Sequence, residues 1–181
     1  PGSTPLNMIR ILSEMTPQYA QAFQTICSMR RYLLAIDETG EPVAFRDNIV
    51  VPYTANEEEM RSLGLSYNVL TELETLGLIK FSTMPGFVTI DMPKKCTICT
   101  YVDGVTKELE EGNHESVAIG NVILTDAGRC LSKITEAVEI KDYELLEKRY
   151  MNRSSTIYKE KATFEITKDE EGTLHFKRRG K

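Results

Sequence analysis

The chain has 181 residues, of which 41% are hydrophobic and 27% are charged, and its formal net charge at pH 7 is −5. This hydrophobic content can support a core, which argues against a chain that is disordered throughout. The negative net charge weighs against non-specific binding to nucleic acid, because such binding relies on neutralising phosphates with lysine and arginine. The sequence shows no membrane-length apolar run and no leader pattern, so we expect no membrane contact. Its four cysteines do not resemble a disulfide scaffold, which favours a reduced, cytoplasmic setting.

The chain is predicted to open with two helices. The first covers residues 6–15, where apolar side chains recur along one helical face. These side chains are Met8, Ile11, Leu12 and Met15. Thr16 followed by Pro17 is typical of a helix start, with threonine as N-cap and proline at the first position. A second helix is therefore predicted from Pro17 to an end near Met29 or Arg31.

Strands are predicted next. Residues 32–36 and 43–45 favour two strands that pair across the turn-rich segment 37–42. Residues 49–53 form a further extended piece. A short acidic helix over residues 57–63, N-capped by Asn56, then ends at Gly64.

The segment from Ser66 to Asp91 has the clearest local pattern. Ser66 is a suitable N-cap for a helix that ends at Gly77. Residues 78–81 and 87–90 have strand character, and the turn formers at 84–86 separate them. A helix followed by a β-hairpin is the order of a recognition helix and its wing. The sequence therefore predicts a winged-helix-like core.

The remaining segments predict an α+β domain with additional strands. Residues 96–102 and 117–124 favour strands on either side of a polar loop over 107–116, and Thr125 N-caps a helix over 126–135. A last helix is predicted over 141–149. Residues 163–167 and 173–177 then predict a hairpin. We place a boundary at 152–155, which gives a winged-helix-like domain over 1–153 and a hairpin appendage with a basic tail over 154–181.

Four phrases in this order resemble a known family. They are Pro1-Gly2-Ser3 with Leu6, Ile9 and Leu12, Ala22-Phe23 with Ile26-Cys27-Ser28, and the segments 73–79 and 119–129. Together they resemble the uncharacterised bacterial family called domain of unknown function 2806, over residues 1–150. The resemblance implies a further helical region upstream, so this chain is expected to be the C-terminal part of a longer protein. It implies no activity, because the family has none established.

Residues that could support catalysis or metal binding form no recognisable site. Cys96 and Cys99 make a single Cys-x-x-Cys pair, and in a strand they would point to opposite faces of the sheet. His114 and His175 are far apart in sequence and lie in no triad phrase. A phosphate-binding glycine loop is also absent. We therefore predict a protein that is not an enzyme, with no cofactor, no metal and no small-molecule ligand.

Binding to nucleic acid is the role that a winged helix suggests. Asn68 and Thr71 on the outward side of the helix could read a base, and Lys80 could contact a phosphate. Glu72 and Glu74, however, would face phosphates without a partner. A DNA-binding winged-helix regulator is therefore the alternative hypothesis rather than the leading one.

The same helix face suits contact with a protein. Tyr67, Glu72 and Glu74 would form an acidic docking face with one aromatic side chain. Winged helices also serve as docking and dimerisation modules, since fold does not fix function. The leading hypothesis is a non-catalytic binding module that acts through protein–protein contacts or self-association.

Overall fold

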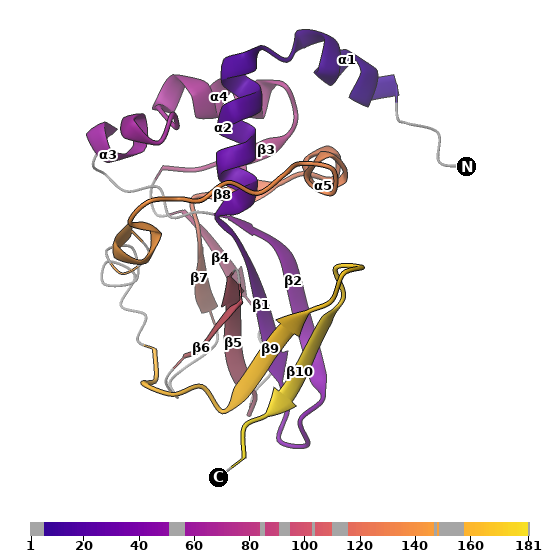
Figure 1. Cartoon of the computed structure of the whole chain (residues 1–181), viewed down its shortest axis with the longest axis vertical. Coiled ribbons are helices and arrows are strands. Elements are labelled where there is room, and N and C mark those ends of the chain that lie inside the picture. The colour runs from indigo at the N-terminus through magenta and orange to yellow at the C-terminus, as the bar shows by residue number, and fades with distance from the viewer. Residues whose placement is uncertain are drawn as a thin grey trace.

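The computed structural model describes residues 6–50, 57–83, 86–90, 95–102, 104–109, 116–146, 148 and 158–180. Helices gather at one end of the molecule and antiparallel strands extend away from them (Figure 1). This arrangement is the predicted α+β class. No helix among the described residues is both long enough and apolar enough to span a membrane.

The helices begin where the sequence predicts. They include α1 (Leu6–Glu14), α2 (Pro17–Ser28), α3 (Glu57–Ser62), α4 (Tyr67–Thr75) and α5 (Asp126–Ser132). Residues 143–146 and 148, within the predicted last helix, are also helical. Thr16, Ser66 and Thr125 accept hydrogen bonds from backbone N–H groups in the first turns of α2, α4 and α5. Each threonine or serine oxygen satisfies an N–H that the helix cannot pair internally. Asn56, the expected cap of α3, lies outside the described residues.

The core of the helical end is built mainly by α2, α4 and the strands next to them. Phe23, Ile26, Leu70 and Leu73 are among its buried side chains. Leu12 was predicted on the buried face of α1, but it is 53% exposed, so this part of the prediction is wrong. Ile11, which was predicted on the same face, is fully buried. Only one narrow face of α1 reaches the core, because this helix lies at the outer edge of the helical end (Figure 1).

A six-stranded sheet has the order β3-β8-β2-β1-β5-β6. Its strands are β1 (Arg30–Ile36), β2 (Pro42–Val50), β3 (Ile79–Phe81), β5 (Thr97–Val102), β6 (Val105–Glu108) and β8 (Val122–Leu124). The predicted pairing of β1 with β2 is confirmed, and β2 continues to Val50 because its end also pairs with β8. The predicted loop over 107–116 is wrong at its start. Lys107 and Glu108 belong to β6, which pairs with β5.

The predicted wing hairpin is wrong in its pairing. Both strands exist, but β3 pairs with β8, whereas β4 (Phe87–Ile90) pairs with β7 (Ser116–Gly120) in a separate two-stranded sheet. The strands β7 and β8 follow each other along one stretch of chain. That stretch therefore runs antiparallel to both β3 and β4, and it replaces the local hairpin.

Together, β3 with β8 and β4 with β7 form one long antiparallel ribbon, and Asn121 lies at the bend between these two pairs of strands. It is buried, and its side-chain amide donates hydrogen bonds to the carbonyl oxygens of Ser82, at 2.8 Å, and Thr83, at 2.7 Å. The ribbon is also tight at Gly86, where a Cβ would lie 2.9 Å from the carbonyl oxygen of Gly120. These contacts hold the segment after β3 against the opposite strand. Met84 and Pro85, the expected turn, lie outside the described residues.

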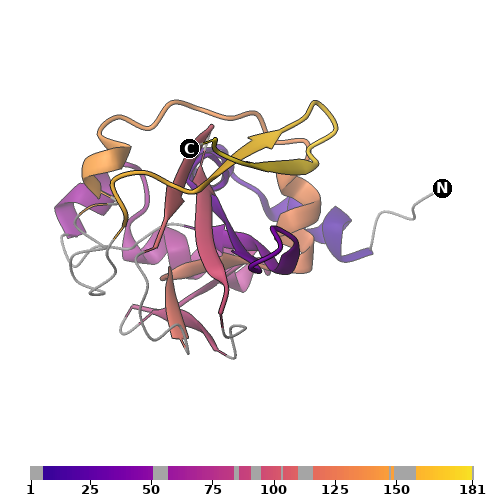
Figure 2. The same cartoon turned by 90° about the horizontal axis from the view of Figure 1, so that it is seen from below.

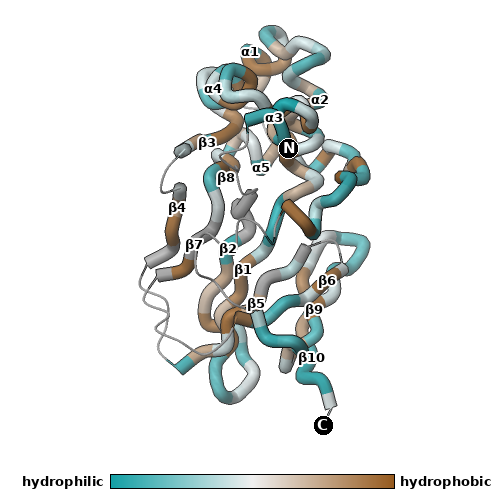
Figure 3. The backbone as a smooth tube through the Cα atoms, turned by 90° about the vertical axis from the view of Figure 1, so that its left-hand side faces the viewer, coloured by the Kyte–Doolittle hydropathy of each residue, from teal (hydrophilic) through white to brown (hydrophobic). Residues whose placement is uncertain are grey.

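The C-terminal hairpin forms as predicted, from β9 (Phe164–Lys168) and β10 (Leu174–Arg178). It lies across one face of the large sheet (Figures 1 and 2). Phe164 and Ile166 of β9 pack into an apolar cluster with side chains of β1 and β5. The side chains from those two strands are Tyr32, Leu34, Ile36, Cys99 and Tyr101. In β10, Leu174 and Phe176 pack against this cluster, and the residues that follow them towards the basic tail are hydrophilic (Figure 3). The boundary predicted at 152–155 lies outside the described residues.

Candidate interaction surfaces

The outward face of α4 presents one aromatic side chain and exposed polar groups. Tyr67 is 48% exposed and packs edge-on against Phe81 of β3, with 5.7 Å between the ring centroids. Asn68 and Glu72 are exposed on the same helix. Thr71 is half-buried, and its hydroxyl donates to the carbonyl oxygen of Asn68 at 2.8 Å. The Thr71 hydroxyl proton is therefore used within the helix.

Glu74 has a structural partner that the sequence did not indicate. Its carboxylate accepts a hydrogen bond from the backbone N–H of Phe81 at 2.9 Å. Phe81 lies on β3, which is an edge strand of the large sheet. An edge strand leaves backbone groups open to pairing with another chain. Glu74 is exposed, as expected for an outward-facing residue, but its carboxylate is bonded to the backbone and covers part of this edge.

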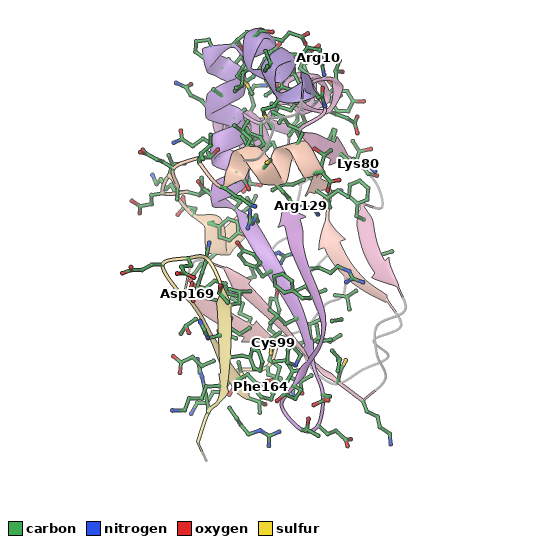
Figure 4. All side chains as sticks on the ribbon, turned by 90° about the vertical axis from the view of Figure 1, so that its right-hand side faces the viewer. Arg10, Lys80, Cys99, Arg129, Phe164 and Asp169 are labelled. Carbon is green, nitrogen blue, oxygen red and sulfur yellow. The ribbon has the colours of Figure 1, made fainter. Side chains whose placement is uncertain are left out.

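Positive charge is scarce around α4. Lys80 is exposed on β3, while Arg10 of α1 contacts the Leu76 carbonyl oxygen at 3.2 Å and Glu14 at 2.9 Å (Figure 4). The neighbouring helix α3 begins with three glutamates, and its arginine pairs with Glu57 at 3.4 Å. Within the described residues, the surface formed by α3 and α4 is therefore mainly acidic.

The cysteine pair divides between the two faces of the sheet. Cys99 lies in the cluster beneath the hairpin, close to Phe164, whereas Cys96 packs into the cluster on the opposite face (Figure 4). This placement confirms the alternation expected for strand residues. Among the described residues, no group of three or more histidines, cysteines and acids could hold a metal ion. His114 lies outside the described residues, and His175 on β10 contacts Asp169 at 2.7 Å.

The more deeply a cysteine thiol is buried, the more slowly it should be alkylated. Burial raises the pKa of Cys27 to about 12, and burial together with the charge of Glu108 raises that of Cys99 to about 12. Cys130 is exposed on α5. We expect iodoacetamide at about pH 8 to modify Cys130 first, Cys27, which is half-buried, much more slowly, and the buried Cys99 only on unfolding, since the thiolate is the reactive form. Mass spectrometry of the labelled peptides tests this. Labelling of Cys99 at the rate of Cys130 would contradict the placement.

A groove of about 700 Å³ lies between the helical end and the tip of the C-terminal hairpin. The sheet face provides aromatic side chains, the end of α5 and the chain after it provide polar ones, and the hairpin tip closes one side. The lining residues used below are Arg30, Tyr32, Phe45, Tyr101, Lys133 and Lys168, with Asp169, Glu170 and Glu171 at the tip. A pocket of about 220 Å³ adjoins it and shares Arg30 and Lys133.

The sequence did not single out this groove. Its residues come from β1, β2, β5, the end of α5 and the chain after it, and the turn of the β9–β10 hairpin, so no single stretch of sequence contains both its aromatic side chains and all its cations. Comparison with protein-family models, with curated proteins and with solved structures finds no match to this chain. The resemblance to domain of unknown function 2806 stays a prediction.

Proposed function

We propose that this chain is a non-catalytic binding module that docks a protein partner through the outward face of α4. The observation that carries the proposal is a 48% exposed tyrosine, Tyr67, on a helix that also exposes Glu72 and Glu74 and has no lysine or arginine. Tyrosine is enriched at protein interfaces, because its ring adds contact area and its hydroxyl can still bond.

Charge indicates the chemistry of the partner. The acidic surface of α3 and α4 favours a partner that presents lysine and arginine around an apolar side chain, which would contact Tyr67. A second copy of this chain fits less well, since its net charge is −5 and two copies of the same acidic face would repel. The partner is therefore a different, basic protein surface.

DNA binding through α4 is the competing function. Asn68 and Lys80 are both exposed, as base reading and phosphate contact would require. Glu72 opposes this role, because an exposed carboxylate on a helix in the major groove would approach phosphates. The hydroxyl of Thr71, bonded within the helix, offers little to a base.

Affinity capture from the source cells tests the proposal. The bait is the full chain, compared with its Tyr67→Ala and Glu72→Lys variants, and Glu165→Lys on the exposed face of β9 is the control. We expect a protein that the wild type and the control retain and both α4 variants lose. With the purified partner, each α4 variant should weaken binding by about tenfold or more.

Equal binding of this partner by all variants would contradict the proposal, as would the absence of any protein lost from both α4 variants. DNA is tested separately with a fluorescent duplex pool at low and physiological salt. Salt-sensitive binding that Asn68→Ala and Lys80→Ala weaken would favour the DNA-binding alternative.

A further inference from the structure

We propose that the groove between the end of α5 and the tip of the β9–β10 hairpin binds a small ligand with one aromatic ring and one phosphate, as in a nucleoside monophosphate. This site is separate from the α4 face and does not depend on its function. The sequence predicted no small-molecule ligand, because it contains no phosphate-binding glycine loop and no recognisable catalytic motif.

Arg30 provides the anion-binding part of the groove. Arg30 is half-buried, and its guanidinium donates hydrogen bonds to the hydroxyls of Ser132, at 2.8 Å, and Tyr32. Both partners are neutral. A partly buried cation without a counter-ion has an unfavourable desolvation energy, which an anionic ligand would offset.

Two lysines surround the same position. Lys133 lines both the groove and the adjoining pocket, and the Lys168 amine lies 3.4 Å from the Tyr32 hydroxyl. Within the described part of the chain, none of Arg30, Lys133 and Lys168 forms an ion pair with a carboxylate. These three cations therefore favour a phosphate among them.

Phe45 provides the surface for a ring. It is 43% exposed and stacks on Tyr32, with 5.9 Å between the ring centroids and an interplanar angle of 13°. Arg30 lies over the Tyr32 ring, 4.8 Å from its centroid. Tyr32 is thus covered, whereas Phe45 keeps an exposed side on which an aromatic base could stack.

The hairpin tip limits how much negative charge the ligand can carry. Asp169 accepts hydrogen bonds from the N–H groups of Glu171, at 3.0 Å, and Thr173, at 2.8 Å, and contacts His175. Its carboxylate is therefore largely satisfied (labelled in Figure 4). Glu170 and Glu171 remain as exposed acids at the rim. They would repel a polyphosphate or a nucleic-acid strand, which favours a single phosphate.

The groove is also of suitable size. Its volume of about 700 Å³ lies within the usual range for small-molecule sites, roughly 300–1,000 Å³. Such a volume admits a base, a sugar and one phosphate together. Polar groups converge on one part of it and aromatic rings on another, as expected for a ligand of this mixed chemistry.

Nuclear magnetic resonance titration of the full chain with AMP and UMP tests the inference. Adenosine and inorganic phosphate are the comparison probes. We expect the two nucleotides to bind, and each comparison probe to bind about tenfold more weakly than AMP. Lys133→Glu and Phe45→Ala should each weaken AMP binding by about tenfold.

Matched controls are Lys161→Glu, an exposed lysine outside the groove, and Val43→Ala, an exposed apolar residue of the same strand as Phe45. Both should bind AMP as the wild type does, and all four variants should be fully folded at the temperature of the titration, as judged by circular dichroism. No binding of either nucleotide at millimolar concentration would overturn the inference. So would binding that the groove variants leave unchanged, or equal affinity for AMP and inorganic phosphate.

Discussion

Replacing Gly128 with alanine is expected to lower the free energy of unfolding by about 3 kcal/mol. A Cβ at this position would lie 2.0 Å from the carbonyl oxygen of Leu78. That oxygen also accepts hydrogen bonds from the N–H and the hydroxyl of Thr125, each at 3.1 Å. The clash is with backbone, so its relief requires α5 to move away from the start of β3.

Urea unfolding followed by circular dichroism measures this effect. Gly180→Ala is the control, because its added Cβ would meet nothing within 4 Å. The control should unfold at the wild-type midpoint. If Gly128→Ala also unfolded within about 0.5 kcal/mol of the wild type, the close contact between α5 and Leu78 would be wrong.

The second large effect is expected at Glu108. Its side chain is 1% exposed, one carboxylate oxygen lies 2.6 Å from the Lys159 amine, and the other accepts the backbone N–H of Thr163. These contacts join β6 to the segment that leads into the hairpin. Glu108→Gln should cost about 3 kcal/mol, because the amide nitrogen cannot accept a hydrogen bond and the Lys159 amine loses its charged partner. Glu165→Gln on the exposed face of β9 is the control.

The same carboxylate predicts how stability depends on pH. Burial acts to raise the pKa of Glu108, but the hydrogen bonds from Lys159 and Thr163 outweigh it and hold the pKa below its ordinary value of 4.5. A group whose pKa is lower in the folded state contributes its stabilisation above the unfolded pKa. That contribution is lost as the pH falls through the folded pKa.

We therefore expect the stability difference between the wild type and Glu108→Gln to be constant at neutral pH and to shrink below about pH 4.5. Unfolding of both proteins by urea across this range measures the difference. A difference that grows as the pH falls would contradict the contacts described for Glu108.

Local signals in the sequence predicted the helices well. Thr16 and Ser66 cap α2 and α4, and Gly77 stops α4 with a φ of +87°, which glycine adopts without strain. Pairing across longer distances was not predictable in this way. The partner of β3 is β8, with Ile79 opposite Leu124, and the spacing of apolar residues in β3 does not identify it.

The candidate sites likewise combine features that the local sequence predicts with features that depend on tertiary structure. The exposure of Tyr67 and Glu72 follows from helical periodicity, so the sequence could predict the α4 face. The contact between Glu74 and the Phe81 N–H depends on where β3 lies relative to α4, which periodicity does not determine. The groove depends still more on tertiary structure, since Arg30 and Lys168 meet at Tyr32 across most of the chain.

Photo-crosslinking from position 67 in the source cells tests the central claim most directly. Tyr67 is replaced by p-benzoylphenylalanine in the full chain, and the same analogue at Glu165 is the control. We predict a crosslinked product specific to position 67 that protease removes and nuclease does not. A product specific to position 67 that nuclease removes, or equal products from both positions, would contradict a protein-docking role for the α4 face.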